Sequence, residues 1–173
     1  MKIKIKNLLI LIVIFCTLIV FFLALGENKI YDTKNLVGKK IGNFELVDLD
    51  ENIKITEIDL IQNDHTLINL WASWCSPCRL EHKYLNNLKK EYDLKILGIN
   101  FKDSKNNAIK YLNEYGNPYH FVAKDFDGKS SIQFGTYGIP ESILIDKNLT
   151  IIKKYIGPLN DESFNEIIEV IKK

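Results

Sequence analysis

Two cysteines separated by two residues are the side chains best suited to chemistry. Cys75 and Cys78 enclose Ser76 and Pro77, and an amphipathic segment follows. At the start of a helix, positions i and i+3 bring both sulfurs to one side, and the free N–H groups and helix dipole stabilise a thiolate there. Cys75 is therefore expected to attack, with a thiol pKa below the usual ~8.5. Cys78, one turn inside, is expected to be less exposed and to resolve the mixed disulfide, while Pro77 helps fix the first turn.

A structural disulfide and a metal site are the other interpretations of this pair. A bond that closes so short a loop constrains the unfolded chain little. Cys75, Cys78 and His82 have the spacing C-x2-C-x3-H, but a closed zinc site needs a fourth ligand, so His65 or His120 would have to converge. We favour thiol-disulfide exchange that needs no cofactor besides the Cys75–Cys78 disulfide, and keep a copper-handling or haem-handling binding module as the alternative.

The N-terminal segment determines the compartment in which the cysteines work. Lys2, Lys4 and Lys6 precede 18 residues without a charge, 8–25. A helix of that length spans roughly 27 Å, close to the ~30 Å of a membrane core. The lysines favour a cytoplasmic N-terminus. The predicted organisation is a cytoplasmic N-terminus at 1–6, a transmembrane anchor at 7–25, a linker at 26–40 and a globular domain at 41–173.

A cleaved signal peptide is the alternative to an anchor. Ala24, Leu25 and Gly26 offer the small residues that a signal peptidase prefers, but the apolar run exceeds the usual ~7 to 15 residues. Retention in the bacterial inner (cytoplasmic) membrane is therefore favoured. Either way the domain reaches the periplasm, where thiols become disulfides unless they are reduced. Cys16 lies within the apolar run and is assigned no chemistry.

Composition limits the number of domains and the kinds of partner. The chain has 173 residues, enough for one ordinary domain plus the N-terminal segment. It is 46% hydrophobic, which is typical of a packed globular protein. Lys and Arg number 23 against 22 Asp and Glu, so no net charge favours binding to nucleic acid.

Strand-like and helix-like segments alternate from Ile41 onward. The fold class is therefore α/β, a three-layer sandwich with a mixed central sheet. Predicted strands lie at 44–47, 66–72, 94–100 and 119–123, with a hairpin formed by 142–145 and 151–155. Predicted helices lie at 75–92, 104–115, 129–134 and from Asp161 onward, the last with Phe164, Ile167, Ile168 and Ile171 on one face.

The chain resembles the thioredoxin-fold thiol-disulfide proteins through residues 71–78 (WASWCSPC) and 138–140 (GIP). More narrowly, it is similar to the CcmG/DsbE branch, which serves cytochrome c maturation. The narrower likeness rests on 78–82 (CRLEH), 98–103 (GINFKD), 115–119 (YGNPY) and 134–142 (FGTYGIPES). One departure is Ser-Pro between the cysteines, where the family has a Pro-Thr type of pair.

The resemblance implies supporting residues around the dithiol. It implies that Pro140 is a cis proline beside the cysteines and that the Ile139 backbone pairs with an extended substrate, with Tyr137 as a further substrate contact. Trp74 would shield the dithiol and offer contact area. Trp71 is expected in the core and His82 at the surface.

Two acidic residues, Glu81 and Glu141, resemble those that distinguish this branch. A carboxylate near a cysteine raises the thiol pKa and makes the pair more reducing. For Glu81 a solvated helix position, paired with Arg79 or Lys83, is an equally weighted alternative.

The activity implied by the resemblance is disulfide reduction. The substrate would be the CxxCH haem-attachment segment of apocytochrome c, reached directly or through a cytochrome maturation protein. A transmembrane thiol reductase would return electrons to the pair. A general or oxidising periplasmic dithiol protein is the alternative within the enzyme class.

Overall fold

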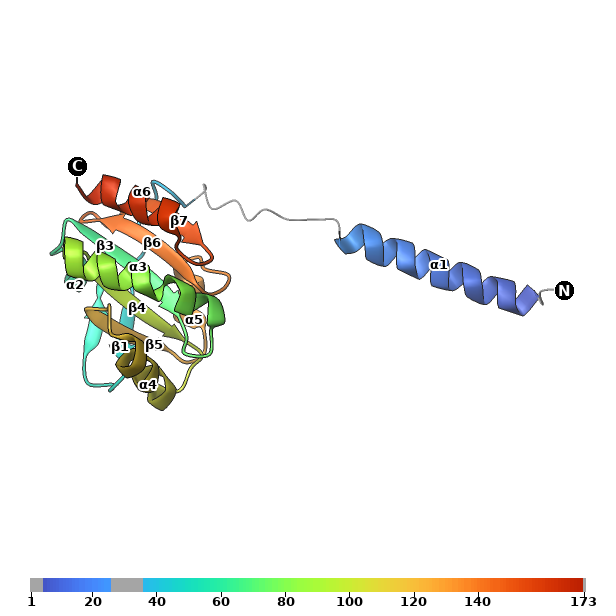
Figure 1. Ribbon diagram of the computed structural model, residues 1–173, viewed down its shortest axis with the longest axis horizontal. Helices are drawn as coiled ribbons and strands as arrows, with labels where there is room; N and C mark the ends of the chain where they lie inside the picture. The colour runs from blue at the N-terminus through green and yellow to red at the C-terminus, as the bar shows by residue number, and fades with distance from the viewer. Residues whose placement is uncertain (1–4, 26–35, 173) are drawn as a thin grey trace. The chain divides into compact units, whose positions relative to one another are not determined.

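The computed structural model describes residues 5–25 and 36–172, which belong to two separate units. The first unit contains helix α1 (Ile5–Leu25), drawn in blue in Figure 1. Its apolar stretch Ile5–Leu23 is long enough to cross a membrane, a property that a signal sequence near the N-terminus shares. The predicted linker at 26–40 and the cytoplasmic segment at 1–6 lie largely outside the described residues.

The second unit is an α/β domain with seven strands in one sheet. The strands are β1 (Glu45–Asp48), β2 (Lys54–Thr56), β3 (His65–Trp71), β4 (Lys95–Phe101), β5 (Phe121–Asp125), β6 (Glu141–Asp146) and β7 (Ile151–Ile156). The helices are α2 (Glu57–Leu60), α3 (Ser76–Tyr92), α4 (Lys105–Tyr115), α5 (Lys129–Gln133) and α6 (Asp161–Ile171). The strand order is β2-β1-β5-β4-β3-β6-β7. Parallel pairs β3–β4 and β4–β5 lie beside antiparallel pairs, so the predicted mixed sheet is confirmed.

Strand β3, in the interior of the sheet, is buried on both sides, because helices and loops cover both faces of the sheet. Side chains of a strand alternate between the two faces. Leu67 and Trp71 face a core that includes residues of α3, α4 and α6, which we call the first face. Ile68 and Leu70 face a second core with Phe44, Leu60 and Phe134, which we call the second face. Figure 1 shows α3 and α6 packed over the sheet.

Most predicted elements are confirmed, including the β6–β7 hairpin and the final helix. Phe164, Ile167, Ile168 and Ile171 all pack on the first face. Strand β5 starts two residues later than predicted. The sequence pattern missed β2 and α2, which have only 3 and 4 residues and are too short to show a period.

The ordered domain begins before Ile41. Gly38 N donates to Ile151 O at 2.8 Å, and Ile41 N donates to Leu149 O at 2.9 Å. Leu36 packs against the second face. Residues 36–40, expected in the linker, are therefore part of the folded unit in the structure.

Candidate functional site

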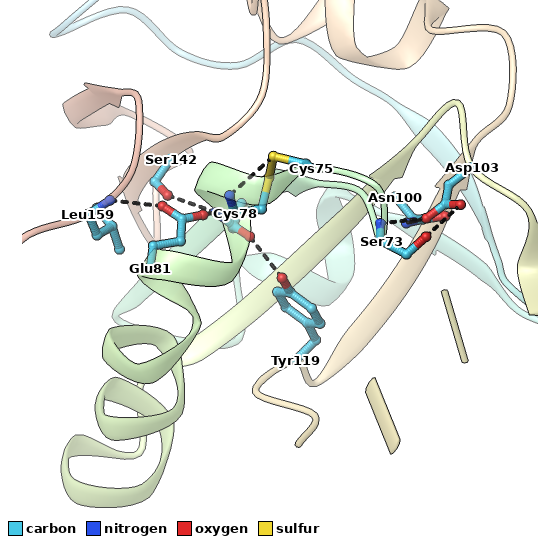
Figure 2. The surroundings of a disulfide bond; sticks show 10 residues. Ser73, Cys75, Cys78, Glu81, Asn100, Asp103, Tyr119, Ser142 and Leu159 are labelled. Atoms are coloured by element: carbon cyan, nitrogen blue, oxygen red, sulfur yellow. Dashed lines mark hydrogen bonds between the residues drawn. A yellow bond between two sulfur atoms is a disulfide. The ribbon is translucent and has the colours of Figure 1, made fainter. Parts of the chain in front are cut away.

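The two cysteines lie where β3 has ended and α3 begins, and they form a disulfide (Figure 2). Cys75 is the N-cap residue of α3, with extended backbone, and Pro77 occupies an early position in the first turn. The Cys75 sulfur accepts a hydrogen bond from Cys78 N at 3.1 Å. A donor of this kind stabilises negative charge on sulfur, which favours Cys75 as the thiolate.

In the disulfide form Cys78 is less exposed than Cys75 by too small a margin to distinguish the two cysteines. Cys75 is 3% exposed and Cys78 is 2% exposed, because both sulfurs pack at the end of the first core. What distinguishes Cys75 is its position at the helix cap and the N–H group of Cys78 that points to its sulfur.

Glu81 lies one helical turn after Cys78 and is completely buried. Its Oε1 accepts from Asn69 Nδ2 at 2.8 Å. Its Oε2 accepts from Leu159 N at 2.9 Å (Figure 2). Burial raises the pKa of Glu81 from its usual 4.5 to about 7, against the opposing effect of these two donors. The alternative of a solvated position paired with Arg79 or Lys83 is therefore wrong. The sequence could not show this burial, because the position lies among charged residues of α3.

Asn69 connects Glu81 to the sheet. Its Nδ2 also donates to Ser142 Oγ at 3.0 Å, and its Oδ1 accepts from Tyr119 Oη at 2.9 Å. Burial raises the pKa of the Tyr119 hydroxyl, which keeps it protonated as a donor. A polar residue inside the apolar run 66–72 was the sequence signal that could have pointed to Asn69, but Asn69 was not predicted as a site residue. This network fixes the position of the Glu81 carboxyl against the sheet.

The loop before β6 contains the predicted substrate contacts. The Ile139–Pro140 peptide bond is cis, as the resemblance implied. Tyr137 is 69% exposed and Ile139 is half-buried. Glu141 is buried, and its Oε1 accepts from Tyr137 N at 2.9 Å and from Gly138 N at 3.1 Å.

The two acidic residues lie on opposite faces of the sheet. Asn69, which donates to Glu81 and to Ser142, forms a cross-strand pair with Ser142 on the first face. Glu141 pairs with Leu70, whose side chain belongs to the second face. Because adjacent strand residues point to opposite sides, Glu141 points away from the Glu81 network.

Trp74 and the segment before Cys75 are tied to the loop after β4. The Trp74 indole is 59% exposed, and its Nε1 donates to Lys102 O at 3.1 Å. Asp103 Oδ2 accepts from Ser73 N at 2.6 Å and from Asn100 Nδ2 at 3.1 Å (Figure 2). Its Oδ1 accepts from Ser73 Oγ at 2.9 Å. Sequence reasoning missed Asp103 as a site residue, although the carboxyl ends of parallel strands meet at one edge of a sheet.

Replacing Asp103 by asparagine should destabilise the loop that carries Cys75. An amide nitrogen would face donors that now share a carboxylate, so the free energy of unfolding should fall by about 1–3 kcal/mol. Urea denaturation of the full chain in detergent, followed by tryptophan fluorescence, measures this change. Asp64→Asn is the control, because the Asp64 side chain forms an exposed ion pair with Lys147. Equal midpoints for both variants would show that these hydrogen bonds do not stabilise the loop.

His82 is buried at 4% exposure, so its prediction as a surface residue is wrong. Its Nε2 lies 2.8 Å from Gly116 O, and its ring packs edge-on against Tyr111. Burial lowers the pKa of His82, which favours the neutral ring. Trp71, predicted in the core, is 1% exposed and stacks on Tyr119. Within residues 5–25 and 36–172, no three His, Cys, Asp or Glu side chains form a group that could hold a metal.

Known proteins are similar to this chain over most of its length. The family model described as Redoxin matches residues 36–171. The chain is 37% identical over 168 residues to the thiol:disulfide interchange protein DsbE of Vibrio cholerae, covering 90% of this chain and 91% of that protein. It is 36% identical over 173 residues to the protein of the same name in Escherichia coli K12, covering 96% and 93%. A thioredoxin-like protein from Aeropyrum pernix superimposes with a TM-score of 0.64 at 21% identity, over 75% of this chain and 88% of that one.

Proposed function

Because this chain belongs to the Redoxin family and, within it, to the DsbE thiol:disulfide interchange proteins, we propose that it reduces disulfides of apocytochrome c. The chain is a thiol-disulfide oxidoreductase with a thioredoxin-like fold. The observation that carries the proposal is the Cys75–Cys78 disulfide at the N-terminus of α3, with the buried carboxyl of Glu81 one turn away.

The proposed reaction starts from the reduced pair. The Cys75 thiolate attacks one sulfur of the substrate disulfide, so a new S–S bond forms and the substrate S–S bond breaks. The first substrate sulfur leaves as a thiolate and takes a proton. The Cys78 thiolate then attacks the Cys75 sulfur, forms the disulfide of the structure and releases the second substrate thiol. Two electrons pass from the pair to the substrate.

Glu81 is proposed to take the proton of Cys78 when that thiol becomes a nucleophile. A buried carboxyl with a pKa of about 7 exists in both protonation states near neutral pH, as a proton acceptor must. Burial also destabilises a charged thiolate relative to the uncharged disulfide. The disulfide-bonded, oxidised form of the enzyme is therefore favoured after each cycle. The pair would thus act as a reductant.

Helix α1 is proposed to anchor the chain in the bacterial inner membrane in a single pass, with the catalytic domain in the periplasm. The exposed apolar side chains of α1 and the lysines before them support this orientation. In a compartment that oxidises thiols, an enzyme that reduces disulfides needs a source of electrons. The proposed source is a transmembrane thiol reductase, and the proposed partner is apocytochrome c or a cytochrome maturation protein.

A mixed-disulfide experiment tests the substrate. In a Cys78→Ser variant the first step can proceed but the second cannot, so reduced enzyme should form a covalent complex with an oxidised CxxCH peptide. Non-reducing electrophoresis detects the complex, and dithiothreitol should reduce the mixed disulfide and release the peptide. The matched control is Cys75→Ser, which retains Cys78 and should form no complex. A complex with unrelated oxidised proteins but not with the CxxCH peptide would contradict the proposed substrate.

A further inference from the structure

A buried lysine holds the loop that carries the cis proline. Lys154 lies on the edge strand β7, yet its side chain is 0% exposed. Its Nζ donates to Gly135 O at 2.5 Å and lies 2.9 Å from Glu141 Oε2. The ammonium group also lies 5.7 Å from the centre of the Tyr137 ring. Every one of these contacts is with the segment 135–141.

The position of Lys154 follows from the pairing of β6 with β7. Lys154 lies opposite Ile143, and Glu141, two residues before Ile143, lies diagonally across from Lys154 on the same face. That face is the second one, to which Ile143 belongs. A long side chain can therefore reach back along the sheet to the loop before β6.

Glu141 completes the attachment of the loop. One of its oxygens accepts from Tyr137 N and Gly138 N, and the other forms the ion pair with Lys154. The ion pair is buried on both sides, at 0% and 2% side-chain exposure. Lys154 thus fixes the start of the loop through Gly135. Glu141 fixes its later part through Tyr137 and Gly138, the two residues before Ile139.

The contacts of Glu141 separate it from the cysteines. Its carboxylate is engaged by a cation and two backbone N–H groups on the second face, whereas Glu81 lies on the first face. The charge of the Glu141 carboxylate is balanced by Lys154, and the group lies on the face of the sheet opposite to Glu81. It is therefore poorly placed to change the energy of the Cys75 thiolate. It is well placed to fix the backbone around Ile139.

We infer that Lys154 is a positioning residue for peptide substrates, acting through Glu141 and Gly135 on the backbone of residues 137–139. The inference rests on the proposed function, because it assumes that this backbone pairs with an extended disulfide-containing peptide. It assigns Lys154 to substrate recognition and leaves the electron-transfer chemistry to Cys75, Cys78 and Glu81.

The test compares two disulfides that differ in their need for the loop. The full chain, in detergent and in its reduced form, is assayed against an oxidised CxxCH peptide and against bis(2-hydroxyethyl) disulfide, which has no peptide backbone. For Lys154→Met, the KM for the peptide should rise about tenfold through loss of charge-assisted contacts, while the rate with the small disulfide stays within about twofold. The equilibrium constant with glutathione should also stay within about twofold of the wild-type value.

Two further variants keep the test decisive. Lys153→Met is the matched control, because Lys153 is the neighbouring residue on β7 and forms a half-exposed pair with Glu166. Removing one partner of a buried ion pair can prevent folding. The double variant Glu141→Gln/Lys154→Met avoids an unpaired charge and retains an oxygen for Tyr137 N and Gly138 N, and its KM for the peptide should remain raised because Gly135 O has lost its donor.

The outcomes separate failure of this inference from failure of the proposed function. If the wild-type chain reduces neither disulfide, the proposed function is wrong. If the wild type reduces both, but the Lys154 variants lose activity equally toward both or keep the wild-type KM for the peptide, the role of Lys154 in recognition is wrong. A shifted glutathione equilibrium in the double variant would likewise overturn it, because it would tie Lys154 to the dithiol.

Discussion

Replacing Cys75 by serine is expected to abolish disulfide reduction by the full chain. A serine hydroxyl at the cap of α3 is not ionised near neutral pH, so it cannot replace the thiolate that Cys78 N stabilises. The rate should fall by at least roughly a thousandfold, as is usual when an enzyme loses its nucleophile. Release of thiols from an oxidised CxxCH peptide measures the rate directly. In cells that depend on this protein, assembly of c-type cytochromes should fail as well.

The cysteine in α1 provides a matched control for this result. Cys16 is free and exposed, and it belongs to the separate N-terminal unit. A Cys16→Ser variant should reduce the peptide at the wild-type rate. The proposed mechanism would be contradicted if the Cys75→Ser variant assembled cytochromes normally, or if it reduced the peptide as fast as Cys16→Ser does.

Replacing Glu81 by glutamine should remove a large pH dependence from the stability of the domain. The pKa of Glu81 is about 7 in the folded chain against its usual 4.5, so the unfolded chain releases this proton at lower pH than the folded chain does. The wild-type free energy of unfolding therefore contains a contribution that is fully present below pH 4.5 and is lost as the pH rises through 7. The shift corresponds to about 3 kcal/mol.

The measurement is a difference between variant and wild type, because glutamine also disturbs the hydrogen bonds to Asn69 and Leu159 by an amount independent of pH. From pH 4 to pH 8, the free energy of unfolding of Glu81→Gln minus that of the wild type should rise by about 3 kcal/mol. Urea denaturation at a series of pH values gives both quantities. Glu91→Gln, at an exposed position of the same helix, is the control. A difference that is flat across this range, or no larger than that of Glu91→Gln, would mean that Glu81 does not titrate as a buried acid.

Sequence reasoning predicted the architecture well because hydrophobic patterns report burial of whole elements. The apolar run 66–72 predicted a buried strand, and the amphipathic segment after the cysteines predicted α3. The same patterns say little about a single polar residue. Glu81 and His82 stand among the charged residues of α3 and are nevertheless buried. Glu81 bonds to Asn69 of β3 and to Leu159 N, and the His82 ring packs against Tyr111 of α4.

The polar contacts around the dithiol were harder to predict, because they join residues far apart in the chain. Glu81 bonds to Leu159, 78 residues later, and Ser73 bonds to Asp103, 30 residues later. Lys154 showed no signal in the sequence, since it follows another lysine in a short strand. The position of Glu141 directly after Pro140 indicated that it lies near the substrate-binding loop. Only the pairing of β6 with β3 and β7 shows on which face of the sheet its side chain lies.

The division of the two carboxyl groups by the sheet has a consequence for protein engineering. Within the part of the chain that the structure describes, Glu81 and Glu141 share no hydrogen-bond partner, because their side chains lie on opposite faces of the sheet. Substitutions that lie more than about 7–10 Å apart and share no partner usually have additive energies. Libraries that vary one face could therefore be screened for redox strength, and libraries that vary the other for choice of peptide, before the best members of each are combined in one chain.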